Sequence, residues 1–170
     1  MLISVRKVHA LIRTKSITMT DPLYEQEVAL REQVLLNSVG LDIEGYKAMA
    51  PGREEQCEHF VAVFDHPRGE RVVGTATLLA PSEDEPFAKV MQVCVDKQRQ
   101  GEGIGTKLMI AIEARAFGEM GIPGLYCHAQ IAAMPFYEKL GWDTASDIFI
   151  EAGIEHKRMQ ISAPKPAESR

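Results

Sequence analysis

One stretch, from Met91 to Gly105, constrains the fold of this 170-residue chain more than any other. It contains most of an almost continuous apolar run, 90–95, followed by a polar turn, 96–99, and a glycine-rich hexapeptide, 100–105. A long helical pattern comes next. A strand, a glycine loop and a helix in this order form a cradle for an anion, because the first N–H groups of the helix have no partner. Glycine lets the backbone approach a phosphate closely. The stretch therefore predicts a phosphate-binding loop.

Three kinds of phosphate loop compete for these residues. A P-loop needs Lys and then Ser or Thr after its last glycine, but the order after Gly105 is reversed. A dinucleotide fingerprint needs a third glycine where Thr106 stands. The pattern Gln/Arg-x-x-Gly-x-Gly/Ala does fit, and is filled by Gln100, Gly103 and Gly105.

A second motif lies downstream, between Gln130 and Trp142. It reads Gln-x-x-Ala-x-x-Phe-Tyr-x-x-Leu-Gly-Trp. With the glycine loop, it resembles the motifs of the GNAT superfamily of N-acetyltransferases, which bind acetyl-coenzyme A. Gln130 stands where that family usually has Asn, and Trp142 where it has Phe. The resemblance covers roughly residues 11–160, and the segment 149–156 is similar to a little-characterised bacterial branch.

The resemblance implies an α+β fold, with a mixed, mostly antiparallel sheet of about seven strands flanked by about four helices. The sequence pattern places the strands at 8–14, 59–65, 71–79, 87–95, 125–128, 149–151 and 156–161. Helices are expected from Asp21-Pro22 to about residue 40, and over 103–120 and 132–140, with a short one within 41–58. We expect one domain over 1–161 with loose first residues, and a disordered tail over 162–170.

The resemblance also implies a cofactor site between two splayed strands, 90–95 and 125–128. Backbone groups of Val93, Cys94 and Val95 would hold the acetyl carbonyl and the pantetheine arm, and an N–H there would stabilise an oxyanion. The pyrophosphate would lie against Gln100, Gly101, Glu102, Gly103, Ile104, Gly105 and Thr106. The second motif would add Gln130, Ala133 and Phe136.

Catalysis of acetyl transfer to an amine needs a base for the ammonium and a donor for the departing thiolate. Tyr137 matches the tyrosine of the family that points at the sulfur. The base is open among His128, Glu151 and His156, and a chain of waters would leave no sequence signature. Transfer needs no covalent enzyme intermediate, so we interpret Cys127, like Cys94, as a packing residue.

Two charged features have competing interpretations. Arg31 resembles a residue of the first helix of the family, and a solvated helix charge explains it equally simply. Glu54, Glu55 and Glu58 fall in the region that borders the acceptor pocket in the family. They predict either an acidic wall that favours cationic amines or a solvated acidic loop.

Composition excludes several classes of protein. The net charge of −5 disfavours nucleic acid and anionic membranes as partners. The three cysteines are widely spaced and form no Cys-x-x-Cys pair, which argues against structural zinc and suits a reducing compartment. No apolar stretch approaches the roughly 20 residues of a membrane helix, and no signal peptide is evident. We therefore expect a cytoplasmic protein without a metal.

The sequence predicts an acetyl-coenzyme A-dependent N-acetyltransferase. It would transfer the acetyl group to a primary amine of a small molecule by direct attack in a ternary complex. The alternative is a non-catalytic module that binds coenzyme A or acetyl-coenzyme A and reports on it. A homodimer is left open.

Overall fold

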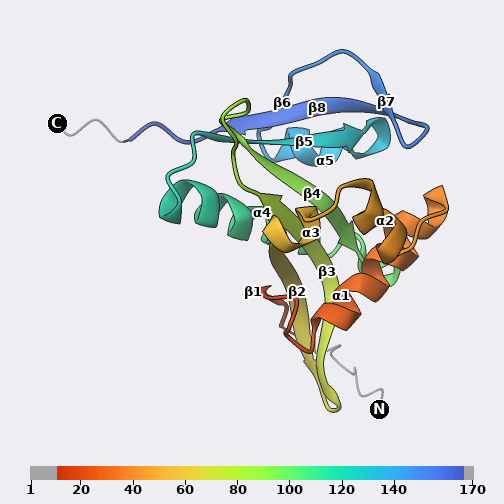
Figure 1. Ribbon diagram of the computed structural model, residues 1–170. Helices are drawn as coiled ribbons and strands as arrows, with labels where there is room; N and C mark the ends of the chain where they lie inside the picture. Colours follow the sequence, from red (N-terminus) through yellow and green to blue (C-terminus); the bar gives the residue numbers. More distant parts are fainter. Residues whose placement is uncertain (1–10, 167–170) are drawn as a thin grey trace, which may run out of the picture.

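The computed structural model describes residues 11–166, which build one eight-stranded sheet with helices packed against it (Figure 1). The sheet order is β1-β2-β3-β4-β5-β8-β6, and β7 pairs with β8. The strands are β1 (Arg13–Ile17), β2 (Glu58–His66), β3 (Gly69–Leu79), β4 (Ala88–Val95), β5 (Gly124–Gln130), β6 (Asp143–Thr144), β7 (Phe149–Glu151) and β8 (Ile154–Ser162). All pairs are antiparallel except β4 with β5.

Five α-helices connect or cover the strands. They are α1 (Tyr24–Arg31), α2 (Ile43–Met49), α3 (Arg53–Gln56), α4 (Ile104–Glu113) and α5 (Met134–Lys139). Helix α1 continues through a π-helical turn, Glu32–Leu36, and a 3-10 turn, Asn37–Val39; helix α4 continues through a π-helical turn, Ala114–Glu119. Single 3-10 turns occur at Lys97–Arg99 and Ile131–Ala133. No helix in the part of the chain described here is long and apolar enough to cross a membrane.

The predicted fold class is confirmed, with local differences in several elements. Region 41–58 forms two short helices, α2 and α3, rather than one. The first strand lies at Arg13–Ile17 rather than 8–14, and residues 1–10 lie outside the described part. Asp21 does not cap a helix: its carboxylate accepts from the N–H of Leu23 at 2.9 Å within a turn, so α1 begins two residues later than expected. The two-residue strand β6 is too short to leave a sequence pattern, and β8 extends to Ser162.

The two faces of the sheet are covered by different helices. Along β2, the side chains of Val61 and Val63 pack with Leu23, beside α1. The alternate residues Phe60 and Ala62 belong to the larger core that contains α4. This alternation is the period of two that a strand imposes on its side chains. The sheet therefore separates an α1 face from an α4 face.

The centre of the sheet is split. The register of β3 and β4 shifts between Thr75 and Thr77, and Gln92, on the bulged strand, has a φ of +53°. Strand β4 pairs with β5 only through Ala88 and Lys89, after which the strands diverge (Figure 1). A β-bulge bends and twists its strand, which accounts for the divergence. The predicted splayed strands are thus present.

Candidate active site

The glycine loop forms an open turn at the start of α4. Gly101 and Gly103 have φ values of +84° and +78°, in the left-handed region that favours glycine. No heavy atom lies within 4 Å of the position that a Cβ would take at either glycine. Gln100 and Glu102 are exposed beside them. The loop therefore presents accessible backbone to an anion at a helix N-terminus, which fits the predicted pyrophosphate site.

The rest of the predicted loop has a different local role. The side chain of Ile104 is buried in the core, so only its backbone faces the loop. A Cβ at Gly105 would lie 3.1 Å from the ring of Phe136, so this glycine allows α5 to pack against α4. Thr106 is half-buried in the first turn of α4. The motifs assigned Gly105 and Phe136 to the cofactor and gave no sign that they contact each other.

A cavity of about 380 Å³ lies where β4 and β5 diverge. It brings together seven of the residues predicted to be functional, contributed by four strands and the segment around α5. These are Val93, His128, Gln130, Ala133, Tyr137, Glu151 and His156. Cys94 and Val95 do not line it; they pair with β3, and burial raises the pKa of Cys94 to about 12. Burial likewise raises the pKa of Cys127 to about 12, which suits packing rather than a thiolate nucleophile.

Tyr137 is held rigidly beside this cavity. Its side chain is 6% exposed, and its ring centroid lies 5.0 Å from Phe136 and 5.2 Å from Trp142. Burial raises the pKa of Tyr137 well above its ordinary value of 10, and Cys127 raises it further. At neutral pH the phenol is protonated, as it would be at its ordinary pKa, and it is a hydrogen-bond donor at the cavity wall.

His128 on β5 and Glu151 on β7 form a hydrogen-bonded pair at the cavity wall. The His128 Nδ1 and the Glu151 Oε1 are 3.0 Å apart. Burial lowers the pKa of His128 below 6.5 and outweighs the carboxylate, which raises it. The neutral imidazole that results donates from Nδ1 to Glu151 and leaves Nε2 as a proton acceptor.

His156 lies next to this pair. Its Nδ1 lies 2.7 Å from the carbonyl oxygen of Ile154, and its Nε2 lies 3.9 Å from Glu151 Oε2. Its ring stacks on Phe149 at an interplanar angle of 20°. Phe149 in turn contacts the ring of His128, with 4.9 Å between centroids. The three candidate bases therefore form one cluster at the cavity wall.

The interpretation of Arg31 as a solvated helix charge is wrong. Its side chain is completely buried, and its guanidinium donates to both carboxylate oxygens of Glu54, at 2.6 and 3.0 Å. Glu27 lies 3.4 Å away, and its Oε1 also bonds His59 Nδ1 at 2.8 Å. Arg31 Nε donates to Gln92 at 3.2 Å. This buried cluster thus holds the bulged residue of β4 in place.

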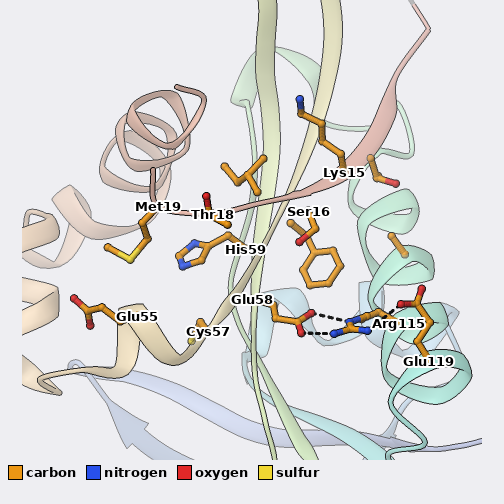
Figure 2. Close-up of a pocket in the computed structure, with 14 residues that line it drawn as sticks. Lys15, Ser16, Thr18, Met19, Glu55, Cys57, Glu58, His59, Arg115 and Glu119 are labelled. Atoms are coloured by element: carbon orange, nitrogen blue, oxygen red, sulfur yellow. Dashed lines mark hydrogen bonds and ion pairs between the residues drawn. The ribbon is translucent and has the colours of Figure 1, made fainter. Parts of the chain in front are cut away.

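The predicted acidic acceptor wall is also wrong. None of Glu54, Glu55 and Glu58 lines the cavity between β4 and β5. Glu54 is neutralised by Arg31, and the other two line a separate cavity of about 690 Å³ beside β1 (Figure 2). There the carboxylate of Glu58 accepts two hydrogen bonds from Arg115, at 3.0 and 2.7 Å. Acidic composition revealed the charges but not the partners that neutralise them.

A sheet split beside a glycine loop at a helix N-terminus defines the class of acyltransferases that use coenzyme A thioesters. The chain belongs to the GNAT family: residues 42–163 match the profile of the acetyltransferase (GNAT) domain. The predicted family is therefore confirmed.

Two curated relatives from Bacillus subtilis strain 168 are similar in sequence. The uncharacterized N-acetyltransferase YjcF is 35% identical over 107 residues, which cover 62% of this chain and 71% of YjcF. The uncharacterized protein YyaT is 30% identical over 106 residues, covering 62% of this chain and 66% of YyaT. The similarity thus spans about two thirds of each relative.

Solved structures show the same fold at low identity. Escherichia coli ElaA superimposes with a TM-score of 0.71 at 18% identity, covering 88% of this chain and 99% of ElaA. An aminoglycoside 6'-N-acetyltransferase complexed with coenzyme A gives a TM-score of 0.70 at 16% identity, covering 91% and 99%. These likenesses concern the fold.

Proposed function

We propose that this protein transfers the acetyl group of acetyl-coenzyme A to a primary amine by direct attack in a ternary complex. One observation carries the proposal: the phenol of Tyr137 and the imidazole of His128 line the same cavity where the sheet splits. Acetyl transfer needs one donor and one acceptor of protons around a single carbonyl.

The cosubstrate supplies an activated thioester, and the residues around the split are suited to bind it. Backbone N–H groups of residues 100–106 would hold the pyrophosphate at the start of α4. The bulge leaves Gln92 and Val93 without partners on β3, and both line the cavity. As the family resemblance implies, backbone groups of Val93, Cys94 and Val95 would contact the pantetheine arm and the acyl carbonyl. Gln130, Ala133 and Phe136 would complete this wall.

Proton transfer follows from the two side chains. His128 Nε2 would accept a proton from the ammonium of the acceptor, while Glu151 holds the ring and stabilises the imidazolium. The nitrogen lone pair then forms a bond to the carbonyl carbon, and the carbon–sulfur bond breaks. Tyr137 would donate its proton to the departing sulfur, and the second proton lost from the nitrogen restores the phenol.

The test is a release assay for coenzyme A with a panel of amines, in which mass spectrometry identifies the acetylated product. Acetyl transfer to a primary amine is expected, with intersecting initial-velocity lines for the two substrates; parallel lines would contradict direct attack. The rate of coenzyme A release with acetyl-coenzyme A, compared with the rates with longer acyl thioesters, measures the selectivity for the acyl donor. Tight binding of coenzyme A without transfer to any amine would instead favour the binding module.

A further inference from the structure

Two cations line the cavity without a partner. Lys89 on β4 and Arg53 at the start of α3 both contribute to its wall. Neither side chain forms an ion pair or hydrogen bond within residues 11–166. Lys89 is partly buried, with its ammonium nitrogen 5.9 Å from the centroid of the Tyr126 ring, and Arg53 is exposed. A partly desolvated ammonium that no carboxylate contacts directly is unfavourable, so the position of Lys89, with the exposed Arg53 on the same cavity wall, is suited to an anion that comes from outside.

The negative charge on this wall is already engaged. Glu151 lies 3.0 Å from His128 and 3.9 Å from His156. Burial lowers the pKa of Lys89, the charge of Arg53 lowers it further, and Glu151 raises it. With two cations and one carboxylate lining the cavity, the local charge of this wall is opposite in sign to the net charge of the chain, −5.

The phosphates of the cosubstrate do not account for these cations. Lys89 and Val95 stand six residues apart on β4, which corresponds to roughly 20 Å along an extended strand. The glycine loop lies beyond Val95. Lys89 is the last residue of β4 that pairs with β5, so it lies at the closed end of the split. An anion there belongs to the groups that react rather than to the pyrophosphate.

We infer that Lys89 and Arg53 form an anion subsite that receives a carboxylate of the acceptor, which is an α-amino acid or a compound of that kind. This inference rests on the proposed function. The amine would face His128, and the carboxylate the two cations. Apolar side chains of Leu36, Val39, Tyr46 and Met49 line the same cavity and would contact the side chain of the acceptor. If the acyl donor instead carried a dicarboxylic acyl group, such as succinyl, its free carboxylate could occupy the same subsite.

The first arm compares amino acids with their carboxamides, using glycine, leucine and phenylalanine with acetyl-coenzyme A. The amides keep the α-amine but lack the carboxylate. The wild type should prefer each acid over its amide in kcat/KM. In Lys89→Met, which keeps the length of the side chain, that preference should fall about 10- to 100-fold, the value of a charged hydrogen bond. Arg53→Gln should reduce it in the same direction.

A matched control removes one positive charge elsewhere. Arg68 is exposed in the turn between β2 and β3, and Arg68→Gln should leave the preference unchanged. The second arm uses a neutral amine, 2-phenylethylamine, with succinyl- and acetyl-coenzyme A. If the wild type prefers the succinyl donor and Lys89→Met loses that preference, the subsite exists but binds the carboxylate of the acyl donor rather than that of the acceptor.

The third arm does not depend on turnover. Calorimetry of the protein saturated with coenzyme A should show that N-acetyl-leucine binds more tightly than N-acetyl-leucinamide, and that Lys89→Met abolishes the difference. If no amine is acetylated but this difference is present, the proposed function fails and the subsite stands. If acids and amides, and both donors, are used and bound equally in wild type and Lys89→Met, the subsite is overturned and the acetyltransferase stands.

Discussion

At the scale of single residues, burial moves two proton-transfer groups in opposite and useful directions. It raises the pKa of Tyr137 and so preserves a donor, and it lowers the pKa of His128 and so preserves an acceptor. The same physical cause has opposite effects because burial disfavours the charged form of either group. One cavity therefore offers both protonation states at neutral pH.

Tyr137→Phe tests the donor. The ring and its contacts with Trp142 and Phe136 remain, so the melting temperature should change little. We expect kcat to fall about 100-fold, at the lower end for general acids, because a coenzyme A thiolate leaves tolerably well unaided. Affinity for coenzyme A should be unchanged, since the bond to sulfur strengthens only as the thiolate forms. A wild-type kcat with chemistry rate-limiting would reject the assignment.

The acceptor is tested through the pH dependence of kcat at saturating substrates. Since the pKa of His128 is lowered below 6.5, its neutral form increases as pH rises through that lowered value, and kcat should rise there and stay level above it. Glu151 raises this pKa, so Glu151→Gln should move the rise to lower pH, although Lys89 and His156 also act on the ring. His128→Gln should remove the rise. A profile that His128→Gln does not alter would exclude this base.

Motifs predicted the residues of the glycine loop and of the cavity lining better than the residues that support them. Tyr137 and the glycine loop follow from local spacing, which the sequence displays directly. The partner of Arg31 is Glu54, 23 residues away on another helix, and no local pattern connects them. The acidic wall failed for the same reason, because Glu58 is neutralised by Arg115, 57 residues later.

At the scale of elements, α4 has left-handed glycines at both ends. Gly103 precedes it with a φ of +78°, and Gly121 follows its π-helical extension with a φ of +64°. Both positions are open, because no heavy atom lies within 4 Å of the point that a Cβ would occupy. A side chain therefore strains the backbone to a similar degree at either end.

Gly103→Glu should weaken coenzyme A binding by roughly 100-fold or more, because it places a carboxylate where the pyrophosphate would approach. Gly121→Glu is the matched control, with the same strain and the same charge at the far end of the helix, and should bind like the wild type. Calorimetry on both folded variants gives the comparison. If Gly103→Glu and Gly121→Glu bind coenzyme A with equal affinity, the loop does not bind the pyrophosphate.

Elements with clear periodicity were predicted closely. Their pairing depends on contacts between residues that are far apart in the sequence, which local patterns do not show. The hairpin of β2 and β3 and the long helix α4 lie where the pattern places them. The bulge at Gln92 was not predicted, because it depends on the buried Arg31 and on the register with β3. The later start of α1, at Tyr24, follows instead from a local turn in which Asp21 accepts from the N–H of Leu23.

At the scale of the whole molecule, the buried cluster connects α1, α3, β2 and β4. Its charges make the stability depend on pH. Burial raises the pKa of Glu54, but the hydrogen bonds and charge of Arg31, with Tyr24 and His59, together lower it by more, so the net direction is down. Burial lowers the pKa of His59, but the hydrogen bonds and charges of Glu27 and Glu54 together raise it by more, so the net direction is up. One carboxyl oxygen of Glu27 is buried without a partner among the described residues. No donor of the cluster therefore forms a hydrogen bond with that oxygen.

Urea unfolding between pH 3 and pH 9 should reveal both effects. The contribution of Glu54 is complete above its unfolded pKa of 4.5 and is lost as pH falls through the lowered value. The contribution of His59 is complete below 6.5 and is lost as pH rises through the raised value. His59→Gln should abolish the alkaline decline and leave the acidic one. An alkaline decline that persists in this variant would assign it to another group.

Because β4 and β5 pair only at Ala88 and Lys89, this sheet has an unusual kind of edge in its interior. Beyond it, β4 and β5 each turn a row of backbone donors and acceptors toward the gap rather than toward each other. Exposed edges of this kind recruit foreign strands and promote aggregation, and proteins usually confine them to the margin of a sheet. Here the bulge twists one edge away, and under the proposed function the pantetheine arm covers the other. Occupancy by the cosubstrate would then protect the protein from self-association as well as supply its acyl group.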